Sequence, residues 1–390
     1  MFTTFARRAA VTQPTLGVRA SRTGTKFNAV TRPYGSPLTM RPDLCRMFSG
    51  FGKPISETSI GVPIETFEGE KRVALSPEAV KRLMKDGFNV NIQKGAGVNA
   101  GFLDEYYEKE GAKIVDNAFK SDIVFKVRPP ASSEFASLEK DSGLISYLQP
   151  RTNESLVDEL KKKNITCYAM NEIPRLSRSQ TFDALSSMAN ISGYKAVIEA
   201  ANLFDRAFMG QITAAGRLPP AKVLIIGAGV AGLSAIASAK NLGAIVKCFD
   251  TRPATKEQVE SMGGQFLTVN IEEDGSAAGG YAKEMSPEFI KAEMELFAKQ
   301  AKECDIIITT ALIPNKAAPK LILKEHVKLM KPGSVIIDLA AEAGGNCEYT
   351  VPGELVEVNG VKICGYTDLP SRLAGQASAL YANNISKFMQ

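Results

Sequence analysis

The sequence predicts an α/β protein built from two doubly wound parallel-sheet domains with a cleft between them. Short apolar runs alternate with helical patterns along most of the chain, which is typical of parallel strands covered by helices. In addition, a glycine-rich turn at residues 227–232 directly follows an apolar run at 221–226 and precedes a helix rich in small residues. This arrangement indicates Rossmann-like domains, whose ligands bind at the carboxyl ends of the strands.

The first predicted sheet begins near residue 59. Its strands are expected at 60–64, 89–93, 122–127, 144–148 and 166–170, with helices such as 154–162 between them. The helix that follows Leu75 has clear boundaries, because Ser76 is a favourable N-cap, Pro77 suits the first helical position and Gly87 suits the residue after the last turn.

The second predicted sheet begins at residue 222. Its strands are expected at 222–226, 244–249, 265–269, 305–310, 334–339 and 362–365. A long helix over about 182–208 connects the two sheets, and a terminal helix over 371–388 is expected to return to the first domain. The predicted division is therefore a leader at 1–56, an N-terminal α/β domain formed by 57–186 plus 366–390, and a Rossmann domain with the glycine-rich turn at 187–365.

The net charge of +5 on the 390 residues comes mainly from the beginning of the chain. Residues 1–42 hold seven Arg and Lys residues and no acidic residue, and they are rich in Ser, Thr and Ala. This composition is typical of an organellar transit peptide and predicts a mitochondrial protein on the matrix side of the inner membrane. Without the seven charges the balance is about −2, so we expect no nucleic-acid partner. No apolar run is long enough to span a bilayer.

Metal binding and disulfide formation are not expected. The six cysteines are scattered without a CxxC pair, which predicts reduced and mostly buried thiols, including Cys167 and Cys248 in apolar strands. The single histidine, His326, lies on a charged helix. A dehydrogenase of alcohols or amino acids needs a proton shuttle as well as a hydride acceptor, and histidine usually serves. The absence of an evident histidine shuttle favours hydride transfer between two nicotinamides, which moves no proton, although Lys or Tyr can also act as a base.

The glycine-rich turn predicts a dinucleotide site. Gly227 makes the tight turn, Gly229 lets the backbone approach a pyrophosphate, and Gly232 allows close packing of helix and strand. Asp250, at the end of the next strand, is placed to accept hydrogen bonds from the adenosine ribose. A 2′-phosphate there would meet like charge, so NAD(H) is favoured over NADP(H); Arg252, two residues later, leaves the alternative open.

A second polar stretch precedes the long connecting helix. Arg175, Gln180, Asp183 and Ser186 supply a cation, an amide, a carboxylate and a hydroxyl over twelve residues. Donors and acceptors of this kind suit a nicotinamide carboxamide, but polar residues before a helix also serve as caps and as solvated surface.

Two further cations, Arg72 and Lys126, stand just past strand ends. They are either anion-binding residues of the cleft or surface cations.

Together these segments resemble the NAD(H)-binding component, domain I, of the proton-translocating NAD(P) transhydrogenases. The resemblance covers about residues 59–388 and includes residues 72–78, 174–183, 227–232, 250–261, 280–285, 309–314 and 335–345. It implies that Arg175, Gln180, Asp183 and Ser186 grip the nucleotide near its nicotinamide, that Tyr281 belongs to a mobile loop that closes over it, and that Leu312 lies near the nicotinamide end. The implied catalytic residues are Arg175, Gln180, Asp183, Ser186 and Tyr281, and the implied cofactor-binding residues are Gly227, Ala228, Gly229, Val230, Gly232, Asp250, Thr251, Arg252, Gly280 and Leu312.

The same resemblance implies partners. In this family, domain I exchanges hydride with NADP(H) held on a separate domain III, and a membrane domain II couples the exchange to proton movement. The sequence ends at residue 390 without either domain. We therefore expect either that both domains lie on another chain, with membrane association only through that partner, or that this sequence is a fragment of a fused enzyme. A homodimer is also implied.

Two alternatives remain. Alanine dehydrogenase shares the fold, and Arg72 and Lys126 match its substrate-anchoring pair. Its catalytic histidine is replaced here, since the corresponding stretch contains Gln149, and its later aspartate corresponds to Glu342. The other alternative is a non-catalytic NAD-sensing module, against which the polar stretch at 175–186 argues.

Overall fold

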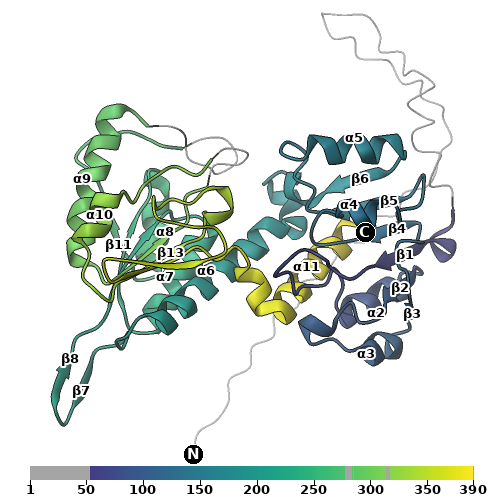
Figure 1. Ribbon diagram of the computed structural model, residues 1–390, viewed down its shortest axis with the longest axis horizontal. Helices are drawn as coiled ribbons and strands as arrows, with labels where there is room; N and C mark the ends of the chain where they lie inside the picture. Colours follow the sequence, from purple (N-terminus) through teal and green to yellow (C-terminus); the bar gives the residue numbers. More distant parts are fainter. Residues whose placement is uncertain (1–52, 277–282, 284, 313–316, 390) are drawn as a thin grey trace, which may run out of the picture. The chain divides into compact units, whose positions relative to one another are not determined.

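The structure is a computed structural model that describes residues 53–276, 283, 285–312 and 317–389. Within this part of the chain, two large sheets and a separate two-stranded hairpin form, and helices cover the large sheets (Figure 1). The predicted α/β fold class is confirmed. Among the described helices, none combines the length and the apolarity that crossing a bilayer requires.

The first sheet has six parallel strands in the order β3-β2-β1-β4-β5-β6. This order places β1 and β4 side by side at the centre, where the connections turn to opposite edges, as in other doubly wound folds. The strands are β1 (Ser59–Val62), β2 (Asn89–Gln93), β3 (Lys113–Val115), β4 (Ile123–Phe125), β5 (Gly143–Ser146) and β6 (Thr166–Ala169), and the helices α2 (Pro77–Lys85), α3 (Asp104–Lys109), α4 (Ser132–Phe135) and α5 (Glu154–Lys162) connect them.

The second sheet has seven strands in the order β11-β10-β9-β12-β13-β15-β14, and only β14 is antiparallel to its neighbour. Its central pair is therefore β9 and β12. The strands are β9 (Lys222–Ile226), β10 (Ile245–Phe249), β11 (Gln265–Leu267), β12 (Ile306–Thr309), β13 (Val335–Asp338), β14 (Leu355–Val358) and β15 (Val361–Cys364), and the helices are α7 (Val230–Asn241), α8 (Lys256–Ser261), α9 (Pro287–Glu303) and α10 (Lys324–Leu329).

The long helix α6 (Ala184–Leu203) takes part in two hydrophobic cores. Its first half places Met188 and Ile191 in the core of the first sheet, and its second half places Val197 and Ala200 in the core of the second. A Cβ on Gly193 would lie 2.0 Å from the Ala231 carbonyl oxygen, so this glycine lets α6 and α7 approach closely.

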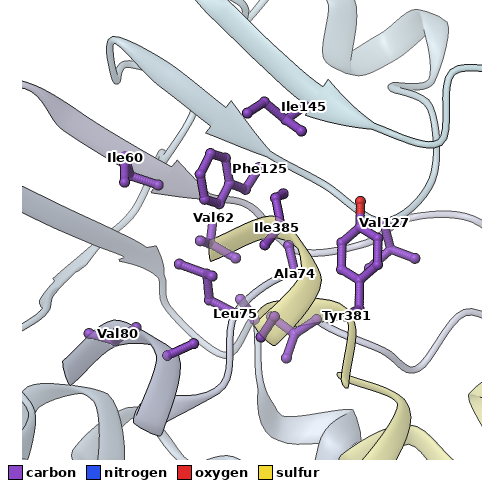
Figure 2. Close-up of a cluster of buried hydrophobic side chains, with 14 of the residues drawn as sticks. Ile60, Val62, Ala74, Leu75, Val80, Phe125, Val127, Ile145, Tyr381 and Ile385 are labelled. Carbon is purple, nitrogen blue, oxygen red and sulfur yellow. The ribbon is translucent and has the colours of Figure 1, made fainter. Parts of the chain in front are cut away.

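The last helix, α11 (Ala374–Phe388), packs on the first sheet, as predicted from its position in the sequence. Figure 2 shows Tyr381 and Ile385 among the side chains of the central strands. The Tyr381 hydroxyl donates a hydrogen bond to the Lys126 carbonyl oxygen at 2.8 Å, so a buried polar group of the helix is satisfied by the sheet.

The sequence did not predict the hairpin of β7 (Gln211–Thr213) and β8 (Gly216–Leu218). The prediction that Cys167 is buried was wrong, because its side chain is exposed. Cys167 lies on β6, an edge strand of the first sheet, where fewer neighbours cover an apolar side chain. The cysteines at 248, 304, 347 and 364 are buried and free, as expected. The end of the segment assigned to the leader contacts the first sheet, because the Lys53 ammonium lies 2.6 Å from the Asp122 carboxylate.

Candidate nucleotide-binding site

A cavity of about 590 Å³ lies at the carboxyl ends of the central strands of the second sheet. Gly227 and Gly229 line it after β9, Asp250 lines it after β10, and Thr310 lines it after β12. Gln149, which follows β5 of the first sheet, lines it too. Strand order brings the residues of the second sheet together, because the crevice of a doubly wound sheet opens where the strand order reverses.

The three glycines of the turn have three different surroundings. Gly227 has a φ of +101°, which residues other than glycine rarely adopt. A Cβ there would also lie 2.5 Å from the Thr310 hydroxyl oxygen. A Cβ on Gly232 would lie 1.8 Å from the Gly227 carbonyl oxygen. A Cβ on Gly229 would meet no described atom within 4 Å. Gly227 and Gly232 therefore shape the turn, and Gly229 leaves its backbone open to the cavity.

The helix that follows the turn presents its N-terminus to the cavity. Gly229 is the N-cap of α7 and makes no side-chain cap, and Val230, the first helical residue, also lines the cavity. The first backbone N–H groups of a helix lack intrahelical acceptors and carry a partial positive charge. This end of α7 is therefore suited to bind an anion such as a phosphate group.

The carboxylate of Asp250 is fully engaged within the protein. Its Oδ2 accepts from the Ala228 amide at 2.6 Å and from the Arg252 guanidinium at 2.7 Å. Its Oδ1 accepts from the Arg252 amide and from Arg252 Nε, both at 2.8 Å. These four contacts use the acceptor positions of a carboxylate. A hydroxyl that binds Asp250 must therefore displace the Arg252 side chain.

The polar stretch before α6 is only partly directed to the cavity. Asp183 is the N-cap of α6 and accepts hydrogen bonds from the Ser186 amide at 2.9 Å and the Ser186 hydroxyl at 2.6 Å. Arg175 lines the cavity, and its Nε lies 3.8 Å from Asp183 Oδ2. Gln180 is exposed, and neither it nor Asp183 or Ser186 lines the cavity. Three of the four residues are thus brought together, with Asp183 also serving as a helix cap.

The remaining predicted nucleotide-binding residues divide into two groups. Thr251, Arg252 and Leu312 line the cavity, whereas Ala228 is buried and contacts Asp250 through its amide. Gly280 and Tyr281 lie outside the described residues.

Arg72 and Lys126 are neither surface cations nor unpaired anion-binding residues. Both are buried, and Arg72 binds the Glu70 carboxylate through Nε at 2.7 Å and a terminal nitrogen at 2.6 Å. The Lys126 ammonium lies 3.1 Å from Glu134 and 3.3 Å from Glu65. Arg72 lines the cavity, but its charge is already balanced.

Burial and ion pairing act in opposite directions on these carboxylates. Burial alone raises the pKa of Glu70, but Arg72, Ser371 and Arg128 outweigh it and hold that pKa at about 2. For Glu65, burial outweighs the Lys126 charge and raises the pKa. Ionised Glu70 is therefore strongly stabilised in the fold, and ionised Glu65 is not.

Sequence reasoning missed several residues of the cavity. Thr310 follows β12 and Tyr366 follows β15, so a search of every strand end could have found both. Met188 and Glu293 come from within α6 and α9, where no local pattern distinguishes a cavity-facing residue from a core residue. His326 is not part of the cavity lining; it is buried and accepts a hydrogen bond from the Leu323 amide.

Family models match both halves of the chain. The N-terminal domain of alanine dehydrogenase/PNT matches residues 61–192, and the C-terminal domain of alanine dehydrogenase/PNT matches residues 196–390. The chain belongs to this family. The predicted resemblance is thus confirmed, and the predicted NAD(H) cofactor fits the family.

Individual relatives extend this comparison. The NAD(P) transhydrogenase subunit alpha of Haemophilus influenzae is 54% identical over 334 residues, which cover 85% of this chain and 65% of that protein. The corresponding subunit alpha of Cereibacter sphaeroides is 53% identical over 333 residues, covering 84% and 64%. The solved transhydrogenase of Sinorhizobium meliloti has 40% identity and a TM-score of 0.77, covering 85% of this chain and 93% of that one. This chain therefore spans slightly less than two thirds of the length of the two alpha subunits.

Alanine dehydrogenase is a more distant relative in the same family. Alanine dehydrogenase 1 of Staphylococcus aureus is 30% identical over 344 residues, which cover 85% of this chain and 87% of that protein. The shared fold therefore does not by itself distinguish alanine dehydrogenase activity from transhydrogenase activity.

The predicted mitochondrial location is contradicted, and the comparisons give no support to the predicted transit peptide. The similar transhydrogenase subunits come from the bacteria Haemophilus, Cereibacter, Rhodospirillum and Rickettsia, and they indicate a bacterial protein. Residues 1–42, whose composition led to the prediction, lie outside the described residues. Such a composition is weak evidence, because any solvated segment that builds no core can be basic and rich in hydroxyl groups.

Proposed function

We propose that this chain is the NAD(H)-binding subunit of a proton-translocating NAD(P)⁺ transhydrogenase. It transfers hydride directly between NAD(H) in the cavity and NADP(H) on a partner domain. The observation that carries the proposal is the turn at residues 227–232, where two glycines shape the backbone and Gly229 leaves it open beside the N-terminus of α7. The names of the two bacterial alpha subunits support the same activity.

The dinucleotide is proposed to lie along the cavity from Asp250 toward Arg175. Its phosphates contact the N–H groups at Gly229 and Val230, and its adenosine ribose binds Asp250 and Thr251 after Arg252 moves aside. Its nicotinamide lies near Leu312 and the group formed by Arg175, Asp183 and Ser186, with Gln180 beside it. Tyr281 and Gly280 are proposed to close over the nucleotide, as the resemblance implies.

The protein's contribution to the reaction is positioning. Hydride transfer from one nicotinamide to another moves no proton, so the site needs no general acid or base. The described cavity lining contains no histidine, and burial raises the pKa of Tyr147 in that lining, so its hydroxyl stays neutral. Holding the two nicotinamide rings at reacting distance by itself removes a large part of the activation barrier to hydride transfer.

The polar stretch before α6 is the proposed contact with the NADP(H)-binding domain III, and a membrane domain II supplies the proton pathway. Residues 175–178 are exposed, including the apolar side chain of Leu176. A hydride donor on another chain must reach the nicotinamide through such an accessible edge.

We also propose a homodimer and the domain division 57–186 plus 366–390 and 187–365. The division is supported by α6, whose two halves belong to different cores. The dimer is supported by the hairpin of β7 and β8, where Ile212 is 90% exposed and Leu218 is 43% exposed. Isolated hairpins are marginally stable in water, so a hairpin with two exposed apolar side chains gains from a partner. Sedimentation of the Ile212→Asp variant tests this, since a monomer is expected.

The deciding experiment is NADPH-driven reduction of acetylpyridine NAD⁺ by the purified chain, with and without an NADP(H)-binding domain III protein. Turnover only when both are present is the expected result. Tight NADH binding without turnover in any mixture would instead indicate a sensing module. Turnover of NAD⁺ with alanine alone would indicate alanine dehydrogenase, which the ion pairs of Arg72 and Lys126 and the presence of Gln149 disfavour.

A further inference from the structure

Glu293 differs from the other buried carboxylates of this molecule. It is 6% exposed and lines the cavity, yet among the described residues no hydrogen bond or ion pair involves its carboxylate. Lys283 also lines the cavity, but no ion pair joins the two side chains. By contrast, the Asp250 carboxylate in the same cavity has four contacts. Leaving a carboxylate buried and unpaired is costly, so it requires an explanation.

The place of Glu293 on its helix locates it at one end of the cavity. Phe289 and Phe297 lie one turn before and one turn after it on α9, and both pack against Phe249, with ring centroids 6.5 and 5.3 Å apart. Phe249 immediately precedes Asp250. The cavity-facing part of α9 therefore lies beside the end of β10 that carries Asp250.

The chemistry of this end suits a flat base that carries a hydrogen-bond donor. When a ribose binds Asp250 and the phosphates bind the turn, the attached base extends beyond Asp250. Ile290 and Met294 of α9 line the cavity beside Glu293 and offer apolar surfaces for the faces of such a base. A carboxylate can only accept hydrogen bonds, so it selects an edge that donates.

We propose that Glu293 recognises the 6-amino group of adenine and makes this site selective for adenine over hypoxanthine dinucleotides. The proposal rests on the proposed function, because it assumes that a dinucleotide occupies the cavity. Hypoxanthine carries an oxygen where adenine carries the amino group, and this oxygen would face the carboxylate acceptor to acceptor. Burial raises the pKa of Glu293 to about 7. This agrees with a carboxylate whose hydrogen-bond donor is supplied by a bound ligand.

The test compares the binding of NADH and of reduced nicotinamide hypoxanthine dinucleotide by calorimetry at pH 8, using the full chain. The unmodified protein is expected to bind NADH at least about tenfold more tightly, the scale of one hydrogen bond to a charged group. In Glu293→Gln the amide can accept from adenine or donate to hypoxanthine, so the preference should fall to about twofold or less.

Two further variants separate recognition from folding. Glu293→Leu cannot hydrogen-bond either base and should also abolish the preference. Glu295→Gln, an exposed position on the same helix, should retain it. An unchanged preference in both Glu293 variants, or equal binding of the two nucleotides by the unmodified protein, would overturn this inference while leaving the proposed function intact. Failure of the unmodified protein to bind NADH would overturn both.

Discussion

The centres of the two sheets have the same strand order, but different groups occupy the carboxyl ends of their central strands. In the second sheet, the chain leaves β9 through Gly227 and Gly229, and the space beside β12 is an open cavity. In the first sheet, the chain leaves β1 toward Glu65, whose carboxylate accepts from the Val127 amide at 2.6 Å just after β4. The Lys126 ammonium then lies between Glu65 and Glu134.

This difference shows that a reversal of strand order creates a potential site but does not guarantee one. In the first sheet, the Val127 amide after β4 donates to a carboxylate of the chain itself, whereas in the second sheet Gly229 leaves its backbone open to the cavity. The first position contributes to stability and the second is free to bind a ligand.

The largest expected effect comes from removing the charge at the filled position. Lys126→Met leaves Glu65 and Glu134 buried without their cation, and it should lower the free energy of unfolding by about 3–5 kcal/mol. Urea unfolding at pH 7 measures this. Glu342→Gln, which breaks the more exposed pair with Arg128, should cost less than about 1 kcal/mol. Similar losses in both variants would mean that the buried pair has no special role.

Acid should weaken the same region through Glu70. Its pKa is about 2 in the folded protein and about 4.5 ordinarily, so ionised Glu70 stabilises the fold above pH 4.5. This contribution, about 3 kcal/mol, is lost as the pH falls from about 4.5 to 2. Glu70→Gln should be less stable than the unmodified protein at pH 7, and the gap should narrow toward pH 3. A gap that is constant with pH would contradict the expectation.

The open position should distinguish its glycines. Gly232→Ala places a Cβ 1.8 Å from a carbonyl oxygen and should lower the free energy of unfolding by about 2 kcal/mol. Gly229→Ala places one in open space, so stability should change by less than about 1 kcal/mol. Because that methyl occupies the proposed phosphate position, NADH affinity should still fall at least about tenfold. Thermal unfolding and calorimetry separate the two effects, and unchanged affinity in Gly229→Ala would refute the phosphate assignment.

The smallest expected effect concerns Arg252. Removing its side chain in Arg252→Ala frees two acceptor positions on Asp250, so NADH should bind about three- to tenfold more tightly. The matched variant Arg217→Ala, on the exposed strand β8, should bind as the unmodified protein does. Weaker NADH binding in Arg252→Ala would instead mean that the guanidinium contacts the nucleotide.

Local patterns were sufficient for much of the fold. The predicted ranges 89–93 and 154–162 coincide with β2 and α5, because alternating burial and clear helix boundaries are encoded within a few residues. The hairpin of β7 and β8 has no buried face and therefore no apolar alternation, so the sequence did not reveal it.

The sequence by itself determined the α/β class, the glycine turn and the acidic residue at 250, because each depends on neighbours close in the chain. Only the tertiary structure decided that Arg72 and Lys126 are neutralised, that Arg252 covers Asp250, and that Glu293 faces the cavity. Each of these depends on which charged groups from distant segments share a buried space. Ion pairs between residues far apart in the chain produce no periodic pattern in a single sequence. They become visible only when the strand order of the fold brings the paired residues into one buried space.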